Sequence, residues 1–188
     1  MKILLEIPSR ALGTQPGYTK FPDEILLMAA ALEKAGNEVK IHDCNLDQLQ
    51  PSDLVEFSPG IIGFSVATGP NIADSLARGA EYKRLLPESK IVWGFRHPSA
   101  LPEQTLKADF IDFVVVGAGE ETMVELAQYL EGAAIGITAI KGLAFKSTDG
   151  KAIINELRPF ITNLDLLPDP AWHLVDLKKY WDVSLIVS

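Results

Sequence analysis

Four short segments of the sequence combine glycine with polar side chains in a way that suits the binding of a ligand. They are residues 8–18, 67–71, 94–99 and 117–120. Glycine has no side chain, so a ligand can approach the backbone there closely. Glycine also serves tight turns, and for any single segment a turn is the simpler interpretation. The four segments together favour a sizeable ligand, provided that the fold brings them to one edge.

The Gly-Ala-Gly turn at residues 117–119 is a weak match to the fingerprint of dinucleotide-binding proteins. Thr122 stands where the fingerprint has its third glycine or alanine, and the turn follows the fifth apolar segment rather than the first. Glu120 and Glu121 would also repel a pyrophosphate at the start of the following helix. The chain has no Gly-Lys-Ser/Thr and therefore no P-loop. These features argue against a nicotinamide or flavin dinucleotide.

Nucleophilic catalysis has little support in the sequence. Ser65 lies in Gly-Phe-Ser-Val-Ala, which resembles a nucleophile elbow with alanine in the last place, but no helix follows it directly. His97 and His173 could serve as bases, yet nothing in the sequence pairs either of them with Ser65. We therefore interpret Ser65 as a serine whose hydroxyl bonds to the backbone.

The run His42-Asp43-Cys44 places soft and hard metal ligands side by side. Neighbouring residues on a strand point to opposite faces, so we do not expect this run to form one metal site. Cys44 is the only cysteine, which excludes an intrachain disulfide and an iron–sulfur or cysteine-rich zinc site built by this chain alone. We expect Cys44 to be a small core residue, and a single cysteine fits a cytoplasmic, reducing location.

The composition of the 188 residues is that of a globular protein, with 47% hydrophobic and 22% charged residues. The formal net charge of −8 argues against a nucleic-acid partner, which would favour a basic face. No apolar segment is long enough to span a bilayer, so we expect no membrane partner either.

Apolar segments of strand length alternate with helical patterns along the first part of the chain. The strands are expected at residues 3–7, 38–42, 61–66, 90–94 and 111–116. This alternation predicts an α/β fold. We expect a Rossmann-like (flavodoxin-like) five-stranded parallel sheet in the order 2-1-3-4-5, with helices on both faces. Its carboxyl edge would gather the four glycine-containing segments.

The helices between these strands carry start and stop signals. They are expected at residues 22–36, 71–85, 102–108 and 120–130. Gly36 and Gly132 should close the first and last of them as left-handed caps, and Asn71 should cap the second at its N-terminus. The first helix is apolar nearly all round, so we expect it to be deeply buried.

Residues 133–188 follow a different pattern, and we treat them as a second unit after a domain at residues 1–132. Residues 142–155 place two strand-like segments around Ser-Thr-Asp-Gly, which predicts a C-terminal β-hairpin. Residues 163–172 carry prolines without a clear period and predict a linker that lies over a surface. Residues 180–188 have the composition of a strand with no turn after it.

The glycine-containing segments also match known motifs. Residues 94–99 resemble the pattern Gly-Gly-x-His-Pro-Ser, and residues 117–120 resemble Gly-Glu-Gly-Glu. Both patterns belong to the amino-terminal cobalamin-binding (B12-binding) domain of B12-dependent radical SAM enzymes, which this chain resembles over most of its length. The similarity extends to residues 63–66 with Asn71, 93–103, 116–122 with Glu125 and Leu126, and 167–172. Phe95 replaces the second glycine of the first pattern, and Ala118 replaces the first acid of the second.

The resemblance implies that cobalamin lies against the carboxyl edge of the sheet, with its long nucleotide tail in a slot lined by small residues. The residues expected to bind it are Ser65, Val66, Thr68, Asn71, Gly94, Phe95, Arg96, His97, Gly117, Ala118, Gly119 and Glu120. Residues 8–20 contain no histidine, so we expect no histidine ligand to the cobalt from this loop. Phe95 would either close the tail slot or stack against the base of the tail.

The resemblance further implies a C-terminal radical SAM domain as partner, which would carry S-adenosylmethionine (SAM) and a 4Fe–4S cluster outside this chain. Our first hypothesis is a cobalamin-binding module of such an enzyme, active in methyl transfer or related radical chemistry. The chain would then be a piece of a longer enzyme without turnover of its own. The alternative is the same fold without cobalamin, which docks a substrate or partner. A third hypothesis is a self-contained enzyme that uses Arg96, His97 and Glu120, although no convincing nucleophile accompanies them.

Overall fold

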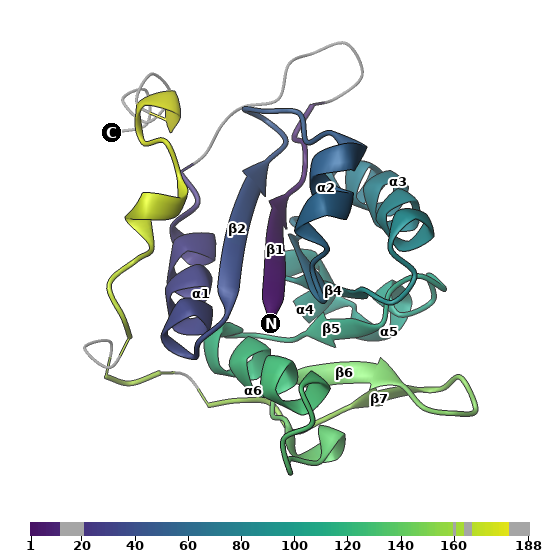
Figure 1. Ribbon diagram of the computed structural model, residues 1–188. Helices are drawn as coiled ribbons and strands as arrows, with labels where there is room; N and C mark the ends of the chain where they lie inside the picture. The colour runs from purple at the N-terminus through teal and green to yellow at the C-terminus, as the bar shows by residue number, and fades with distance from the viewer. Residues whose placement is uncertain (12–20, 160, 164–166, 181–188) are drawn as a thin grey trace.

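The fold is built on one sheet of seven strands in the order β2-β1-β3-β4-β5-β6-β7 (Figure 1). The computed structural model describes residues 1–11, 21–159, 161–163 and 167–180. The strands are β1 (Lys2–Ile7), β2 (Glu38–Asp43), β3 (Ile61–Ser65), β4 (Lys90–Gly94), β5 (Phe113–Val115), β6 (Leu143–Lys146) and β7 (Ala152–Ile154). The first five strands pair in parallel, which confirms the predicted order of the parallel sheet.

Helices cover both faces of the sheet, as predicted. They are α1 (Asp23–Lys34), α2 (Pro51–Phe57), α3 (Pro70–Leu85), α4 (Arg96–Ala100), α5 (Pro102–Thr105) and α6 (Glu120–Leu130), with short 3-10 turns η1 (Ile137–Ala139) and η3 (Trp172–Leu174). The apolar residues of α1 and α6 pack on one face of the sheet, and those of α2 and α3 pack on the other. Among the described residues no helix is both long and apolar enough to cross a bilayer.

Two of these helices were not predicted, and one predicted cap is wrong. We expected no helix in residues 44–59, but they include α2. We expected a loop after β4, but this segment contains α4. Asn71 lies inside the first turn of α3, and Gly69 occupies the N-cap position instead. The Asn71 side chain donates from Nδ2 to the Pro8 carbonyl oxygen at 3.0 Å, so it fixes the start of the loop after β1 rather than capping its own helix.

The core divides into two clusters, one on each face of the sheet. On β1, Leu5 faces α1 and α6, whereas Leu4 faces α2. Glu6 follows the same alternation as Leu4 and is fully buried on that second side. The predicted caps Gly36 and Gly132 do adopt left-handed backbone angles, with φ of 88° and 90°.

The predicted hairpin at residues 142–155 is present, and it extends the same sheet. β6 pairs with β5 in antiparallel orientation, so that Leu143 lies opposite Val115, and β7 follows as the outer strand. The sheet therefore crosses the boundary that we drew between residues 132 and 133. That division into two units stays a prediction.

The C-terminal segment runs along α1 toward β2 (Figure 1). The Ala171 backbone N–H donates to the Leu26 carbonyl oxygen at 3.1 Å. Further on, the Tyr180 hydroxyl donates to the Asp43 carboxylate at 3.1 Å. The predicted linker does lie over a surface where it is described. Its residues 164–166 and most of the strand expected at 180–188 lie outside the described residues.

Cys44 does not belong to the apolar core, contrary to our expectation. It is half-buried, and its thiol donates to the Glu6 carboxylate with Sγ 3.0 Å from Oε1. Burial and then the nearby Glu6 charge raise the pKa of the Cys44 thiol, which keeps it protonated. Cys44 therefore sits in a polar cluster rather than among aliphatic side chains.

Candidate functional site

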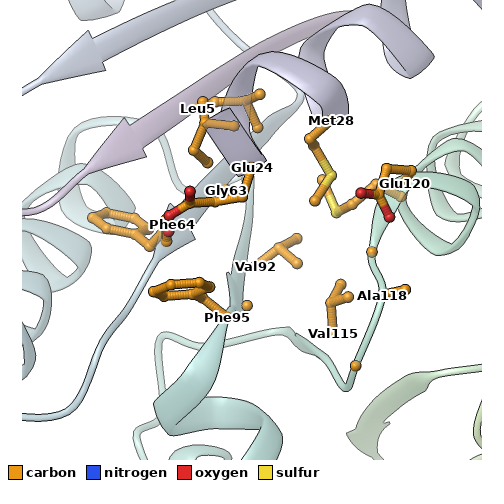
Figure 2. A pocket seen from close by; sticks show the side chains of 16 residues that line it. Leu5, Glu24, Met28, Gly63, Phe64, Val92, Phe95, Val115, Ala118 and Glu120 are labelled. Atoms are coloured by element: carbon orange, nitrogen blue, oxygen red, sulfur yellow. The ribbon is translucent and has the colours of Figure 1, made fainter. Parts of the chain in front are cut away.

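A cavity of about 210 Å³ opens at the carboxyl ends of β3, β4 and β5, between α1 and α6 (Figure 2). Its lining is formed by Leu5, Glu24, Ile25, Met28, Gly63, Phe64, Ser65, Val92, Gly94, Phe95, Val115, Gly117, Ala118, Gly119, Glu120 and Met123. Carboxyl ends of parallel strands next to the point where the strand order reverses are the usual ligand site of this architecture. We call this cavity the slot.

Glycines keep the walls of the slot close together. A Cβ atom at Gly119 would lie only 2.7 Å from Met28 Cε and 3.1 Å from Val115 Cγ1. A Cβ atom at Gly63 would lie 3.2 Å from Leu5 Cδ2. Glycine at position 119 therefore lets α6 approach α1, and glycine at position 63 leaves room for the Leu5 side chain.

Phe95 forms part of the wall in a backbone conformation that normally requires glycine. It follows β4 directly, with φ of 82° and ψ of −154°. A side chain in this region costs on the order of 1–3 kcal/mol and persists only where the surroundings enforce it. The pattern Gly-Gly-x-His-Pro-Ser, which residues 94–99 resemble, has its second glycine at this position. The chain therefore keeps the glycine conformation and adds an aromatic ring. The guanidinium of Arg96 lies 5.1 Å from the centre of that ring.

Glu120 supplies a hydrogen-bond acceptor at the slot. It is the first residue of α6, and its Oε2 atom is buried without a hydrogen-bond partner in the described part of the chain. A carboxylate there is favoured by the helix dipole, but a buried oxygen without a donor is costly. A ligand that brings an N–H or O–H group to this atom would remove that cost.

The turn between β5 and α6 is held by contacts from two sides. Gly117 has φ of 81°, and its backbone N–H donates to Ser99 Oγ at 3.1 Å. One residue earlier, the Val116 N–H donates to the Gly142 carbonyl oxygen at 2.8 Å. Helix α4, through Ser99, and the start of the hairpin, through Gly142, thus both fix the rim of the slot.

The structure gathers most of the residues that we predicted for cofactor binding. Those that line the slot are Ser65, Gly94, Phe95, Gly117, Ala118, Gly119 and Glu120. Those that do not line it are Val66, Thr68, Asn71, Arg96 and His97. Val66 is fully buried, and its backbone bonds to Gly94 and to His97 join the ends of β3 and β4. A role in cofactor binding stays a prediction for both groups.

We did not predict from the sequence that residues of α1 line the slot. Glu24, Ile25 and Met28 line the slot from this helix, and Met123 adds to it from α6. Because α1 is apolar nearly all round, no periodicity marks which of its faces meets a cavity. The prediction that residues 8–20 supply no histidine ligand concerns a loop whose residues 12–20 lie outside the described residues.

The family of the chain follows from comparison with known proteins. Residues 10–127 match the model of the B12 binding domain, which is more than half of the chain. The chain therefore belongs to the B12-binding domain family, and the predicted membership is confirmed.

Its relatives are longer proteins. The chain is 28% identical to cytidylyl-2-hydroxyethylphosphonate methyltransferase of Streptomyces wedmorensis, over 100% of this chain and 43% of that protein. It is 31% identical to an uncharacterized methyltransferase, PH0819, of Pyrococcus horikoshii, over 96% of this chain and 40% of that protein. The chain thus spans less than half the length of these relatives.

A solved structure supports the fold. The cobalamin-dependent S-adenosylmethionine radical enzyme OxsB, with aqua-cobalamin and S-adenosylmethionine bound, superposes with a TM-score of 0.76. The match covers 97% of this chain and 25% of that one, at 18% sequence identity. This likeness shows that the two proteins share a fold. At 18% identity it does not show that they share an activity.

Proposed function

We propose that the chain holds cobalamin, with the nucleotide tail of the cofactor in the slot, and serves as the cobalamin-binding module of a radical SAM enzyme that transfers methyl groups. Membership of the B12-binding domain family supports the cofactor. The two relatives named as methyltransferases support the reaction. SAM and a 4Fe–4S cluster would belong to the length of the relatives that this chain does not span.

The main support for this proposal is that the size and lining of the slot suit the flat aromatic base of the nucleotide tail. Small-molecule sites usually enclose about 300–1,000 Å³, so a slot of about 210 Å³ suits a part of a large ligand rather than the whole. Its walls are apolar side chains such as Met28 and Val115, and Phe95 adds an aromatic ring. With that ring in place the slot remains open, which favours stacking over closure as the role of Phe95.

The polar groups of the slot also suit the cofactor. Cobalamin carries hydroxyl donors on the ribose of its tail and amide donors around its ring. The unpartnered Oε2 atom of Glu120 is an acceptor that such a donor would satisfy. The residues present therefore fit the group.

When bound, cobalamin supplies a cobalt centre that can accept and donate a methyl group. The chain's own contribution is to orient the cofactor and to exclude water from its tail. Residues 63–65 and 117–119 do this through their backbone at the strand ends, and Phe95 and Met28 do it through apolar contact.

The experiment that tests the proposal compares cobalamin with cobinamide, which lacks the nucleotide tail. Binding of each to the purified chain is measured by the visible spectrum of the protein fraction after equilibrium dialysis. If the slot holds the tail, hydroxocobalamin should bind at least about tenfold more tightly than dicyanocobinamide, which corresponds to about 1.4 kcal/mol. The spectrum should lack the change caused by histidine ligation.

Gly94→Trp should remove the difference between the two ligands by filling the slot. A Cβ atom at Gly94 would make ordinary contact with Val115, 3.6 Å away, so the backbone can accept a side chain there. Gly136→Trp is the matched control, because Gly136 does not line the slot and a Cβ atom there would meet only Thr138 Oγ1, at 4.0 Å. Equal loss in both variants would contradict the assignment of the slot.

A second variant decides the role of Phe95. Weaker cobalamin binding in Phe95→Gly would assign the ring to stacking, and tighter binding would show that it obstructs the tail. If neither the chain nor Phe95→Gly retains cobalamin, the alternative of a docking domain without cofactor gains support.

A further inference from the structure

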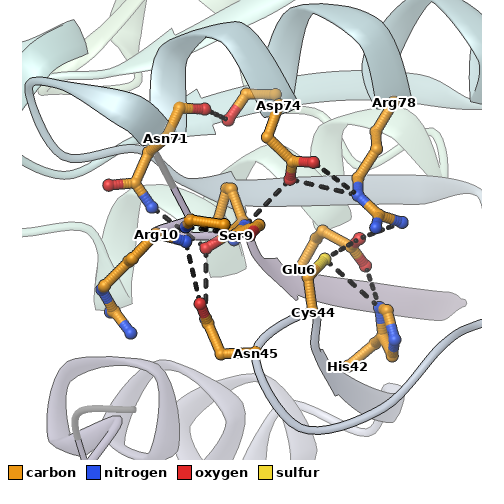
Figure 3. Close-up of polar contacts among 12 residues, drawn as sticks. Glu6, Ser9, Arg10, His42, Cys44, Asn45, Asn71, Asp74 and Arg78 are labelled. Carbon is orange, nitrogen blue, oxygen red and sulfur yellow. Dashed lines mark hydrogen bonds and ion pairs between the residues drawn. The ribbon is translucent and has the colours of Figure 1, made fainter. Parts of the chain in front are cut away.

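Glu6, His42 and Cys44 bring three potential metal-ligating atoms together on the side of the sheet away from the slot (Figure 3). His42 Nδ1 lies 2.9 Å from Glu6 Oε2, and Cys44 Sγ lies 3.0 Å from Glu6 Oε1. Cys44 Sγ lies 3.8 Å from His42 Nδ1, and with one ligand atom from each residue the three atoms all lie within 4.8 Å of one another. Glu6 is fully buried and His42 is 7% exposed. Cys44 is half-buried and connects the cluster to solvent.

The parallel pairing of β1 with β2 creates this cluster. The register places Glu6 beside His42, and Cys44 follows two residues later. Residues two apart on an extended chain point to the same side, so His42 and Cys44 both face Glu6 while Asp43 points away. Our sequence argument against a metal site considered neighbouring residues only and therefore missed the cluster.

The orientation of the His42 ring suits metal binding. Its Nε2 lies 3.2 Å from the backbone carbonyl oxygen of Asp47, which can only accept a hydrogen bond. Nε2 is therefore the protonated nitrogen of the neutral ring, and Nδ1 carries the lone pair. Metal-bound histidines are commonly oriented in this way by a second hydrogen bond. Since Nδ1 and the Glu6 carboxylate are both acceptors, a cation has to lie between them, either a proton or a metal ion.

We propose that Glu6, His42 and Cys44 bind a divalent zinc ion. Zinc prefers thiolate, imidazole and carboxylate ligands at about 2.0–2.3 Å, with one position left to water when three protein ligands are present. Tetrahedral geometry with these bond lengths separates ligand atoms by about 3.3–3.6 Å. The separation of 3.8 Å between Cys44 Sγ and His42 Nδ1 is already close to this range. His42 and Cys44 face different oxygens of the Glu6 carboxylate, so the carboxylate has to turn until one oxygen lies near both. Magnesium and calcium are excluded because they require oxygen ligands and avoid thiolates.

The charges around the cluster are compatible with the ion. The Arg78 guanidinium lies 3.7 Å from Glu6 Oε1 and opposes a cation, but Arg78 is itself paired with Asp74 at 3.1 Å. Zinc binding would break the Cys44 S–H bond and the N–H bond of a protonated His42. Two protons leave to solvent as one divalent ion enters, so the net charge of the cluster does not change. The Tyr82 hydroxyl, 3.0 Å from Glu6 Oε1, continues to orient the carboxylate.

The single cysteine makes the site directly testable with cobalt(II) as a probe for zinc. The cobalamin-free chain is titrated with Co²⁺ under reducing conditions. A thiolate-to-cobalt charge-transfer band in the near ultraviolet can arise only from Cys44. We expect this band together with the intense visible bands of a four-coordinate ion, and we expect one equivalent of Zn²⁺ to abolish both.

Variants separate the proposed ligands from other groups. Cys44→Ser should remove the charge-transfer band, and His42→Gln should weaken Zn²⁺ binding by more than about 100-fold, since even residues beyond the ligands contribute tenfold or more. His173→Gln is the matched control, because His173 is exposed and paired with Glu33 elsewhere. It should leave Zn²⁺ binding unchanged. Circular dichroism checks that each variant is folded.

A measurement on the unmodified chain covers the case in which a variant fails to fold. Bound Zn²⁺ should slow the alkylation of Cys44 by iodoacetamide at least about tenfold. Absence of a cobalt–thiolate band, or an unchanged alkylation rate at saturating Zn²⁺, would overturn the proposal and leave a proton as the cation between Glu6 and His42.

Discussion

Arg158 reaches back from the segment after β7 to Glu121 on α6, with its guanidinium 2.5 Å from the Glu121 carboxylate. The same guanidinium contacts Glu125, and its Nε donates to Thr122 Oγ1 at 3.2 Å. The Arg158 side chain is only 11% exposed, so water screens these contacts weakly on the arginine side. The hairpin segment thus fixes the first turn of α6, which also carries Glu120.

Arg158→Gln should lower the free energy of unfolding by about 1–2 kcal/mol, because hydrogen bonds to charged groups are lost while the Glu121 side is already partly screened. Urea unfolding followed by circular dichroism measures this. Lys151→Gln is the control, since its partner Asp149 is solvent-exposed and the pair is expected to contribute nothing measurable. If the free energy of unfolding falls equally in the two variants, the contacts of Arg158 with α6 do not stabilise the fold more than an exposed ion pair does.

Phe95→Gly and Phe95→Ala both remove the ring, but only glycine relieves the backbone at φ of 82°. We expect Phe95→Gly to be more stable than Phe95→Ala by about 1–2 kcal/mol. At Leu101, where φ is −136°, the corresponding glycine variant should be no more stable than the alanine variant. Thermal unfolding of the four proteins checks both statements, and equal melting temperatures at position 95 would argue against backbone strain there.

Glu120→Ala should affect cofactor affinity and stability in opposite directions. Removing a buried oxygen that has no partner should leave the stability of the cofactor-free chain unchanged or raise it. The same change should weaken hydroxocobalamin binding about five- to tenfold through loss of an acceptor. Glu121→Ala is the control, and it should lower stability by releasing Arg158. Spectroscopic titration and urea unfolding give the two quantities, and a loss of stability in Glu120→Ala would contradict the argument.

The sheet was predictable from sequence because strands buried on both faces leave apolar runs of characteristic length. Residues 61–66 predicted β3 in this way. The glycines at or after the carboxyl ends of β3, β4 and β5 predicted the edge at which the slot lies. Helix α2 was not predictable, since of its seven residues only Leu54 and Phe57 are buried, too few to establish a helical period.

The contacts between side chains of different helices and strands could not be predicted from the sequence. Nothing in the pattern of α1 distinguishes Met28, which lines the slot, from Ala29, which is buried in the core. The meeting of Glu6 with His42 likewise depends on the register of two parallel strands, which no local pattern specifies. Asn71 has a residue type that suits an N-cap, but its amide instead bonds to the Pro8 carbonyl across the sheet edge.

Gly119→Ala should close the slot from one side without unfolding the chain. The new methyl group would meet Met28 Cε at 2.7 Å and Val115 Cγ1 at 3.1 Å. The Met28 side chain can move because it is long and unbranched, and Val115 has to yield by only a few tenths of an ångström. The space open to it is the slot, so hydroxocobalamin binding should weaken about tenfold or more while the melting temperature changes little. Adding Met28→Ala should restore binding, because the two side chains no longer compete. If the double variant binds as poorly as Gly119→Ala alone, Gly119 acts through the backbone turn and not through the wall that it shares with Met28.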